Sequence, residues 1–276
     1  MREDILTTEL QKVSSESQRR ELYSMDWLDD KDKIIEGAFA ECYLKMHPMI
    51  CIHGILFTID GIVSDESGIK NDIYSMVRPY VTSGLARKVE QLLQTIKLEA
   101  YSEPLPLQTD RIHVANGTLF LNGEFSEQKD FCLIRLPVIY DPDVEKPARW
   151  LKFMEELLNP DDILTLQEYM GYMLLPTTKA QKMMLIIGKG GEGKSRIGRV
   201  LRELFGNNMY SCSLQKIEVD KFARANLEYM LITVDDDMKL EALPQTNHIK
   251  SIVTLEDQID LERKGQQSFQ GVVYAR

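Results

Sequence analysis

Long apolar runs are missing from this sequence of 276 residues. No stretch approaches the roughly 18 consecutive apolar residues that a transmembrane helix needs. The first ten residues, MREDILTTEL, are polar and charged, and a secretory signal peptide would place an apolar segment there. We therefore expect a soluble cytoplasmic protein without a membrane partner.

Closely spaced cysteine pairs are also missing. The four cysteines include no C-x-x-C motif, so we expect reduced thiols. One local cluster combines Cys42, His47, Cys51 and His53. Thiolate and imidazole are zinc ligands, but the usual spacing of zinc sites is absent, and half-buried packing accounts for the same residues. The sequence leaves both interpretations open.

Basic residues are in the minority, with 33 Lys and Arg against 43 Asp and Glu and a net charge of −10. Nucleic-acid-binding proteins commonly carry a basic face or an overall basic charge. Binding of nucleic acid by this chain would therefore have to depend on a local basic patch. The apolar content of 43% is sufficient for a sizeable core, in one large domain or two ordinary ones.

The clearest motif spans residues 188–195, which read GKGGEGKS and match the pattern G-x-x-x-x-G-K-[ST] at every fixed position. An apolar run at residues 183–187 precedes it and predicts a buried strand. Apolar residues at helical spacing follow over 197–204, and Gly206 stands where a helix C-cap glycine is expected. A strand before the motif and a helix after it favour a phosphate-binding loop over an ordinary glycine-rich turn.

The chemistry of a nucleoside triphosphate explains these residue types. Glycines let successive backbone amides face an anion, and the helix N-terminus adds partial positive charge. Lys194 can reach the β- and γ-phosphates, and the Ser195 hydroxyl can ligate Mg²⁺. The residues expected to bind ATP are Gly188, Gly190, Gly191, Glu192, Gly193, Lys194, Ser195 and Arg196.

A second apolar run, at 227–234, ends in three aspartates about 40 residues after the loop. In P-loop ATPases, carboxylates at such a strand end hold Mg²⁺ and orient water. We assign Asp235 to Mg²⁺, through water and together with Ser195, and Asp236 to the attacking water. Asp237 is the alternative, because it shares a strand face with Asp235. A solvated acidic turn is the simpler interpretation of the same residues.

The rest of the chain is organised as a polar tail at 1–25, a domain at 26–147 and a domain at 148–276, with a linker at 140–147. Apolar periodicity predicts helices at 26–46, 69–80, 85–100, 150–158 and 161–175. It also predicts strands and hairpins within 50–64, 112–121, 131–136 and 259–269. The last hairpin has a basic tip at Arg263 and Lys264, and Lys250 lies in helical surroundings before it.

With these residues in place, the chain resembles the phage and plasmid primase–helicase family, which are hexameric AAA+ ATPases of helicase superfamily III. The similarity covers roughly residues 54–276. The stretches that carry it are 116–119, 136–142, 150–174, the loop GKGGEGKS, the strand end TVDDD and residues 250–258 with Lys264 beyond.

The resemblance implies an α/β fold: a P-loop AAA+ core of parallel sheet flanked by helices, after a smaller α+β accessory domain of the poxvirus primase/helicase type. It also implies a replicative DNA helicase of a phage, plasmid or other mobile element, driven by ATP and Mg²⁺. Such proteins form homo-oligomeric rings, commonly hexamers, and work with a primase or another replication partner. Lys250, Arg263 and Lys264 would then lie towards the central channel and contact DNA.

Two departures from the family qualify this resemblance. Leu255 and Glu256 stand where the family has two glycines before the position of Asp257. No residue matches the family's γ-phosphate-sensing asparagine or its arginine finger, since the chain ends at Arg276 within the expected strand. We therefore expect a truncated AAA+ domain with weak ATPase activity of its own.

Two other functions fit the same motifs. One is a nucleotide-dependent switch or assembly protein that does not unwind DNA, and the other is a truncated subunit that binds nucleotide without hydrolysing it. Residues 1–150 show no paired-carboxylate motif of a primase centre, so no primase activity is assigned.

Overall fold

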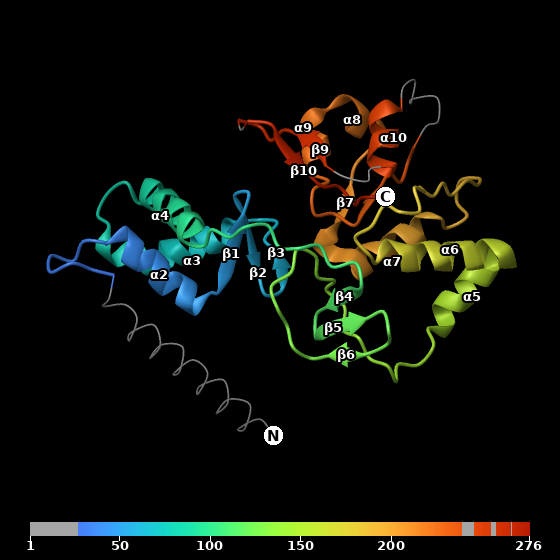
Figure 1. Ribbon diagram of the computed structural model, residues 1–276, viewed down its shortest axis with the longest axis horizontal. Coiled ribbons are helices and arrows are strands. Elements are labelled where there is room, and N and C mark those ends of the chain that lie inside the picture. The colour runs from blue at the N-terminus through green and yellow to red at the C-terminus, as the bar shows by residue number, and fades with distance from the viewer. Residues whose placement is uncertain (1–26, 239–245, 255–257, 266) are drawn as a thin grey trace. The chain divides into compact units, whose positions relative to one another are not determined.

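A computed structural model describes residues 27–238, 246–254, 258–265 and 267–276, so the predicted polar tail lies outside the described residues. The chain is mixed α/β with small sheets (Figure 1). It divides into two compact units. The first holds the described residues up to Ile59 with Val63–Pro104, and the second holds Asp60–Ile62 with Leu105–Arg276. The predicted linker at 140–147 falls within the second unit.

No helix in the described part combines the length and apolar character needed to cross a bilayer.

The first unit packs three helices beside a small antiparallel sheet. Its elements are α2 (Glu36–Met46), β1 (Met49–Ile52), β2 (Ile55–Thr58), α3 (Ser67–Val77), the 3₁₀ turn η1 (Arg78–Tyr80) and α4 (Leu85–Glu99). Strand β1 pairs with β2 from Met49 opposite Thr58 to Ile52 opposite Ile55. Trp27, Phe39 and Ile73 are almost fully buried in its core. The predicted helices at 69–80 and 85–100 are confirmed.

Helix α2 begins about ten residues later than predicted. Residues 27–35 form a turn closed by a bridge between Leu28 and Ile34, and the main-chain nitrogen of Ile35 donates to the carbonyl of Trp27 at 2.9 Å. The apolar spacing of Ile34 and Ile35 therefore reflects this turn. The predicted end of the helix at His47-Pro48 is confirmed, because proline cannot continue the hydrogen-bond pattern.

The predicted hairpins are present, with small shifts at the turns. A turn at 59–60 leads to β3 (Gly61–Ile62), and the amide of Val63 donates to the carbonyl of Leu56 at 2.9 Å. In the second unit, β4 (Arg111–Val114), β5 (Gly117–Phe120) and β6 (Phe125–Ser126) form an antiparallel sheet in that order. A side chain at Gly117 would collide with the backbone of Ser126, so only glycine fits there.

The predicted strand at 131–136 is wrong. Its backbone is not a strand, and a buried arginine ties this segment to the sheet. The guanidinium of Arg135 donates to the carbonyls of Val114 (2.7 Å), Gly117 (3.1 Å) and Asp130 (2.9 Å). Charge-assisted bonds from this side chain, together with a main-chain bond from the Leu136 amide to the carbonyl of His113 at 2.9 Å, therefore attach the segment in place of a regular strand.

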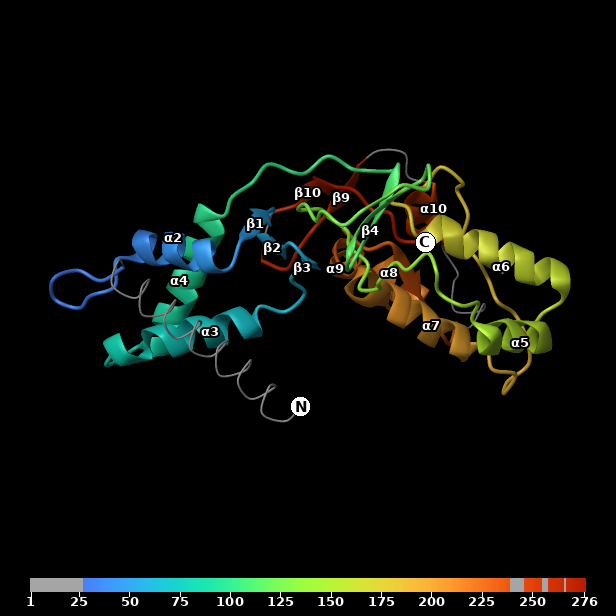
Figure 2. The same cartoon turned by 90° about the horizontal axis from the view of Figure 1, so that it is seen from below.

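Helices α5 (Ala148–Leu157), α6 (Pro160–Met173) and α7 (Ser195–Phe205) lie near one another in the second unit (Figure 2), and all three contribute to its main core. All three were predicted. Each helix contributes apolar side chains to this core, and they are Met154, Leu166, Met173, Ile197, Leu201 and Phe205. The turn that follows α7 is also tied to the segment after the antiparallel sheet, because the side-chain Nδ2 of Asn208 donates to the carbonyl of Arg135 at 2.7 Å.

The remaining elements follow α7 in short pieces. They are η2 (Gly206–Asn208), β7 (Met209–Ser211), α8 (Leu214–Val219), α9 (Lys221–Ala225), β8 (Ile232–Val234), α10 (Asn247–Val253), β9 (Ile259–Leu261) and β10 (Phe269–Gly271). Strands β7 and β8 are parallel, and β9 and β10 form the predicted antiparallel hairpin. Strand β8 is shorter than the predicted 227–234, although Leu227 and Leu231 are fully buried.

The predicted buried strand at 183–187 is wrong as well. The segment is irregular, and Leu185 and Ile187 are 49% and 79% exposed. A strand needs a neighbour for its main-chain groups, and no strand in the described part pairs with this segment. Strand β8 bonds to β7, and its Thr233 amide donates to the carbonyl of Arg276 at 3.0 Å. The described parallel sheet thus has two strands only.

Candidate nucleotide-binding site

The loop at 188–195 leads directly into α7, and two of its glycines are required by its conformation. Gly191 and Gly193 have φ angles of 85° and 100°, in the region that residues with a Cβ atom avoid. A Cβ atom at Gly193 would also lie 3.3 Å from the Phe153 ring on α5. The sequence motif therefore forms a tight turn at a helix N-terminus, as predicted.

The backbone of this loop offers donors to an anion. Within the described residues, the amides of residues 190–195 donate to no protein acceptor. The first bonds of the turn come from the amides of Arg196, to the carbonyl of Gly193 at 2.8 Å, and of Ile197, to that of Lys194 at 3.0 Å. Free amides at a helix start suit phosphate oxygens.

At the C-terminal end of α7, Gly206 has a φ angle of 52° and its amide donates to the carbonyl of Arg202. The predicted C-cap is therefore confirmed.

Lys194 points back into its own loop. Its Nζ atom donates to the carbonyl of Lys189 at 2.6 Å and lies 3.3 Å from a carboxylate oxygen of Glu192. Glu192 and Lys194 therefore form an ion pair at the place where the motif predicts phosphate binding. A triphosphate that binds to Lys194 would compete with the Glu192 carboxylate for the same ammonium group.

This competition predicts that Glu192→Gln raises the affinity for ATP. The pair is partly exposed, and such pairs contribute about 0.2–1 kcal/mol, so we expect a gain of roughly 1.5- to 5-fold at low salt. Titration with a fluorescent ATP analogue measures it. Glu203→Gln, an exposed glutamate on the same helix α7, is the control and should leave the affinity unchanged. Weaker binding by Glu192→Gln would mean that the carboxylate assists the nucleotide instead.

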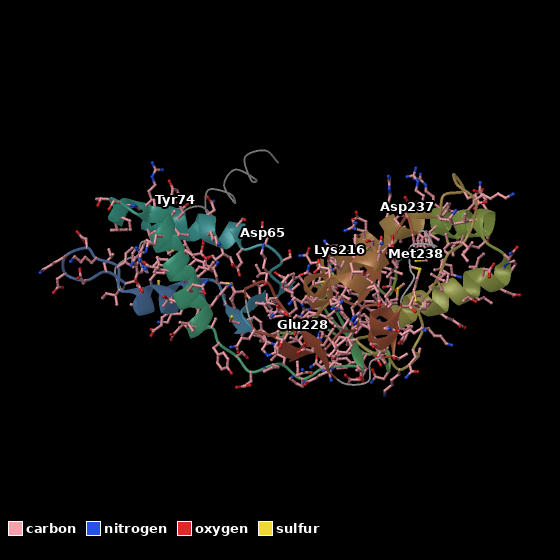
Figure 3. All side chains as sticks on the ribbon, turned by 90° about the horizontal axis from the view of Figure 1, so that it is seen from above. Asp65, Tyr74, Lys216, Glu228, Asp237 and Met238 are labelled. Carbon is pink, nitrogen blue, oxygen red and sulfur yellow. The ribbon has the colours of Figure 1, made fainter. Side chains whose placement is uncertain are left out.

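The acidic end of β8 faces the same cavity as the loop. This cavity, of about 790 Å³, is lined by residues 190–195 on one side and 233–238 on the other. Asp237 and Met238 lie where the chain leaves β8 (Figure 3). One oxygen of Asp235 accepts from the amide of Leu214 at 2.9 Å and the other from that of Asp237 at 3.3 Å. The Asp235 carboxylate is thus held in place, whereas Asp236 is exposed.

The donor set at this position suits a hard cation. Ser195 and Asp235 also line one crevice together, beside the larger cavity. A hydroxyl and a carboxylate are oxygen donors of the type that Mg²⁺ accepts, and phosphate oxygens and waters usually complete its shell. The residues present therefore fit a magnesium–triphosphate complex held by Ser195 and Asp235.

The candidate zinc residues are not gathered into one group. In the part of the chain that the structure describes, no three His, Cys, Asp or Glu side chains are placed to hold a metal ion. Cys42 and Cys51 are buried in the core of the first unit. His47 lies 3.3 Å from a carboxylate oxygen of Asp72.

The predicted basic tip is partly engaged within the protein. The Arg263 guanidinium pairs with Glu228, which is 4% exposed, and lies 4.4 Å from the centre of the Phe269 ring. Lys264 and Lys250 are exposed. Of the three cations assigned to DNA, two are therefore oriented to solvent and one holds the hairpin.

Sequence reasoning missed two arginines near this site. Arg199 and Arg202 line the crevice that contains Ser195, and Arg202 donates to the Ser211 hydroxyl. The spacing of Arg196, Arg199 and Arg202, three residues apart on one helix, was the available signal.

Comparison with known proteins adds a match to one family model, described as a family of unknown function (DUF5906), over residues 186–276. The matched segment begins just before the glycine-rich loop and includes the acidic end of β8. No curated protein matches the chain.

Proposed function

We propose that this protein is the ATP-dependent motor part of a replicative DNA helicase of a phage, plasmid or other mobile element, with a P-loop AAA+ core that assembles into a homo-oligomeric ring. The observation that supports it best is the common cavity between the loop at 188–195 and the aspartates after β8. A phosphate-binding loop opposite carboxylates is the arrangement that ATP hydrolysis requires.

Each residue has a distinct role in this proposal. The loop amides and Lys194 bind and neutralise the β- and γ-phosphates, with the ammonium exchanging Glu192 for phosphate oxygen. Ser195 and Asp235 would hold Mg²⁺, which supplies charge neutralisation at the phosphates. Asp236, exposed in the cavity wall, orients the attacking water. Lys264 and Lys250 are the proposed channel contacts to DNA, and Arg263 positions the hairpin.

DNA-stimulated ATPase activity tests this function. We expect ATP turnover to increase when single-stranded DNA is added to the oligomer, because a translocating motor couples hydrolysis to the strand. ATP binding and hydrolysis that ignore DNA would favour a nucleotide-dependent switch or assembly protein. Failure to bind ATP at all would refute both functions.

A further inference from the structure

The outward face of α7 is strongly basic in an acidic protein. Arg196, Arg199 and Arg202 follow at intervals of three residues, and all three are exposed. Residues 179–202 contain seven Lys and Arg and a single Glu, whereas the whole chain has a net charge of −10. Five of these seven cations lie in the glycine-rich loop or just after it, and the other two, Lys179 and Lys182, precede it.

In the part of the chain that the structure describes, these arginines form no ion pairs that would stabilise the fold. Within the described residues, the side chains of Arg196 and Arg199 have no ion-pair or hydrogen-bond partner, and the Arg202 side chain bonds only to the neutral Ser211 hydroxyl. An uncompensated set of guanidinium groups attracts anions, and arginine is the side chain best suited to phosphate, because its planar donors match two oxygens at once.

A crevice of about 440 Å³ lies beside this face. Its lining includes two of the arginines, three hydroxyl groups and two of the aspartates, namely Arg199, Arg202, Ser195, Ser211, Ser213, Asp235 and Asp236. Arginine and serine are typical contacts to a phosphate backbone. No aromatic side chain is among the described residues that line the crevice, whereas protein interfaces commonly depend on aromatic anchors.

We propose that this crevice and the arginine face of α7 bind the phosphodiester backbone of a single-stranded nucleic acid, next to the nucleotide site. Arg199 and Arg202 lie about 4.5 Å apart along the helix axis, so they contact one phosphate or two neighbouring ones. Asp235 and Asp236 repel the strand unless a cation neutralises them. Binding is therefore stronger when Mg²⁺ and nucleotide occupy the adjacent site, and this coupling, unlike the contact itself, rests on the proposed function.

Salt titration of the full chain with a labelled oligothymidylate tests the proposal. Arg199→Gln/Arg202→Gln should weaken binding and reduce the slope of log affinity against log salt by about 1.4, since each contact on a single strand contributes about 0.7. Arg87→Gln/Arg149→Gln removes the same charge from two exposed positions, on α4 and α5, and should leave the slope unchanged. Arg199→Lys/Arg202→Lys should restore the slope.

Four results would overturn it. An unchanged slope in the Gln variant would exclude contacts by these arginines, and a loss confined to Lys264→Ala would assign the strand to the hairpin. Equal losses in the control pair would show attraction by overall charge only. Displacement of the oligonucleotide by polyglutamate at equal charge concentration would indicate an acidic protein partner. In a separate measurement, a fluorescent ATP analogue should bind the Gln variant and the wild type with equal affinity. If the analogue did not bind the wild type, the nucleotide site would be refuted, but the contact of Arg199 and Arg202 with the strand would not.

Discussion

Lys194→Ala is expected to abolish ATP hydrolysis and to weaken binding of Mg·ATP by about 10- to 100-fold, because a hydrogen bond to a charged group contributes roughly 1.5–3 kcal/mol. Hydrolysis depends more strongly on this lysine than binding does, since negative charge on the transferred group must be stabilised during the reaction. Equilibrium binding of a fluorescent ATP analogue and phosphate release from the complete protein measure the two effects.

Lys189→Ala is the matched control. Lys189 lies in the same loop and is exposed, but it occupies a variable position of the motif, so both binding and turnover should remain close to wild type. The contacts that Lys194 itself loses are partly exposed and contribute little to folding, so the unfolding temperature should not change. Wild-type affinity and turnover in Lys194→Ala would exclude this residue from the site.

Asp236→Asn should leave ATP bound but lower the rate of hydrolysis by about 10²–10⁴-fold, the range that a positioned acid–base group contributes. The substitution removes the charge that orients water and preserves the size of the side chain. Asp235→Asn should in addition raise the Mg²⁺ concentration needed for activity. Asparagine keeps one acceptor oxygen, so a bond from the Leu214 amide can remain.

Turnover at several Mg²⁺ concentrations separates these two roles, and Asp237→Asn supplies the internal comparison. Asp237 is exposed, and its amide donates to Asp235, so its carboxylate is expected to be dispensable. If Asp237→Asn alone stopped hydrolysis, the assignment would have to shift along the strand to the residue on the same face as Asp235.

Local patterns predicted the helices and the loop well. The helical stripes of α4 and α7 and the cap glycine Gly206 depend on neighbours three or four residues away, and such information is contained in a short stretch of sequence. The conformation of the loop was also predictable, since Gly191 and Gly193 occupy positions that exclude other residues. Lys194 and Asp235 were assigned to one site, and both line the same cavity.

Long-range pairing was not predictable. The apolar run at 183–187 matches a buried strand, but a strand exists only where another strand lies beside it. The run at 131–136 is held by the Arg135 side chain, and a charged residue in an apolar run gives no indication of its buried acceptors. The pair between Arg263 and Glu228, 35 residues apart, likewise exists only in the folded chain. By contrast, the basic face of α7 was predictable, because its three arginines follow one another at intervals of three residues in the sequence.

The core around α7 determines which parts of the chain can fold on their own. Ile197, Leu201 and Phe205 pack against side chains from α5 and α6, which precede the segment that matches the family model. The Asn208 side chain bonds to the carbonyl of Arg135, 73 residues away, and the Arg276 side chain bonds to the carbonyl of Leu175, 101 residues away. Closing each of these loops costs conformational entropy. The packing that offsets this cost forms only when the complete unit folds. We therefore expect residues 186–276 not to fold on their own, although they match the family model as one segment, because excising them would expose an apolar helix face that leads to aggregation.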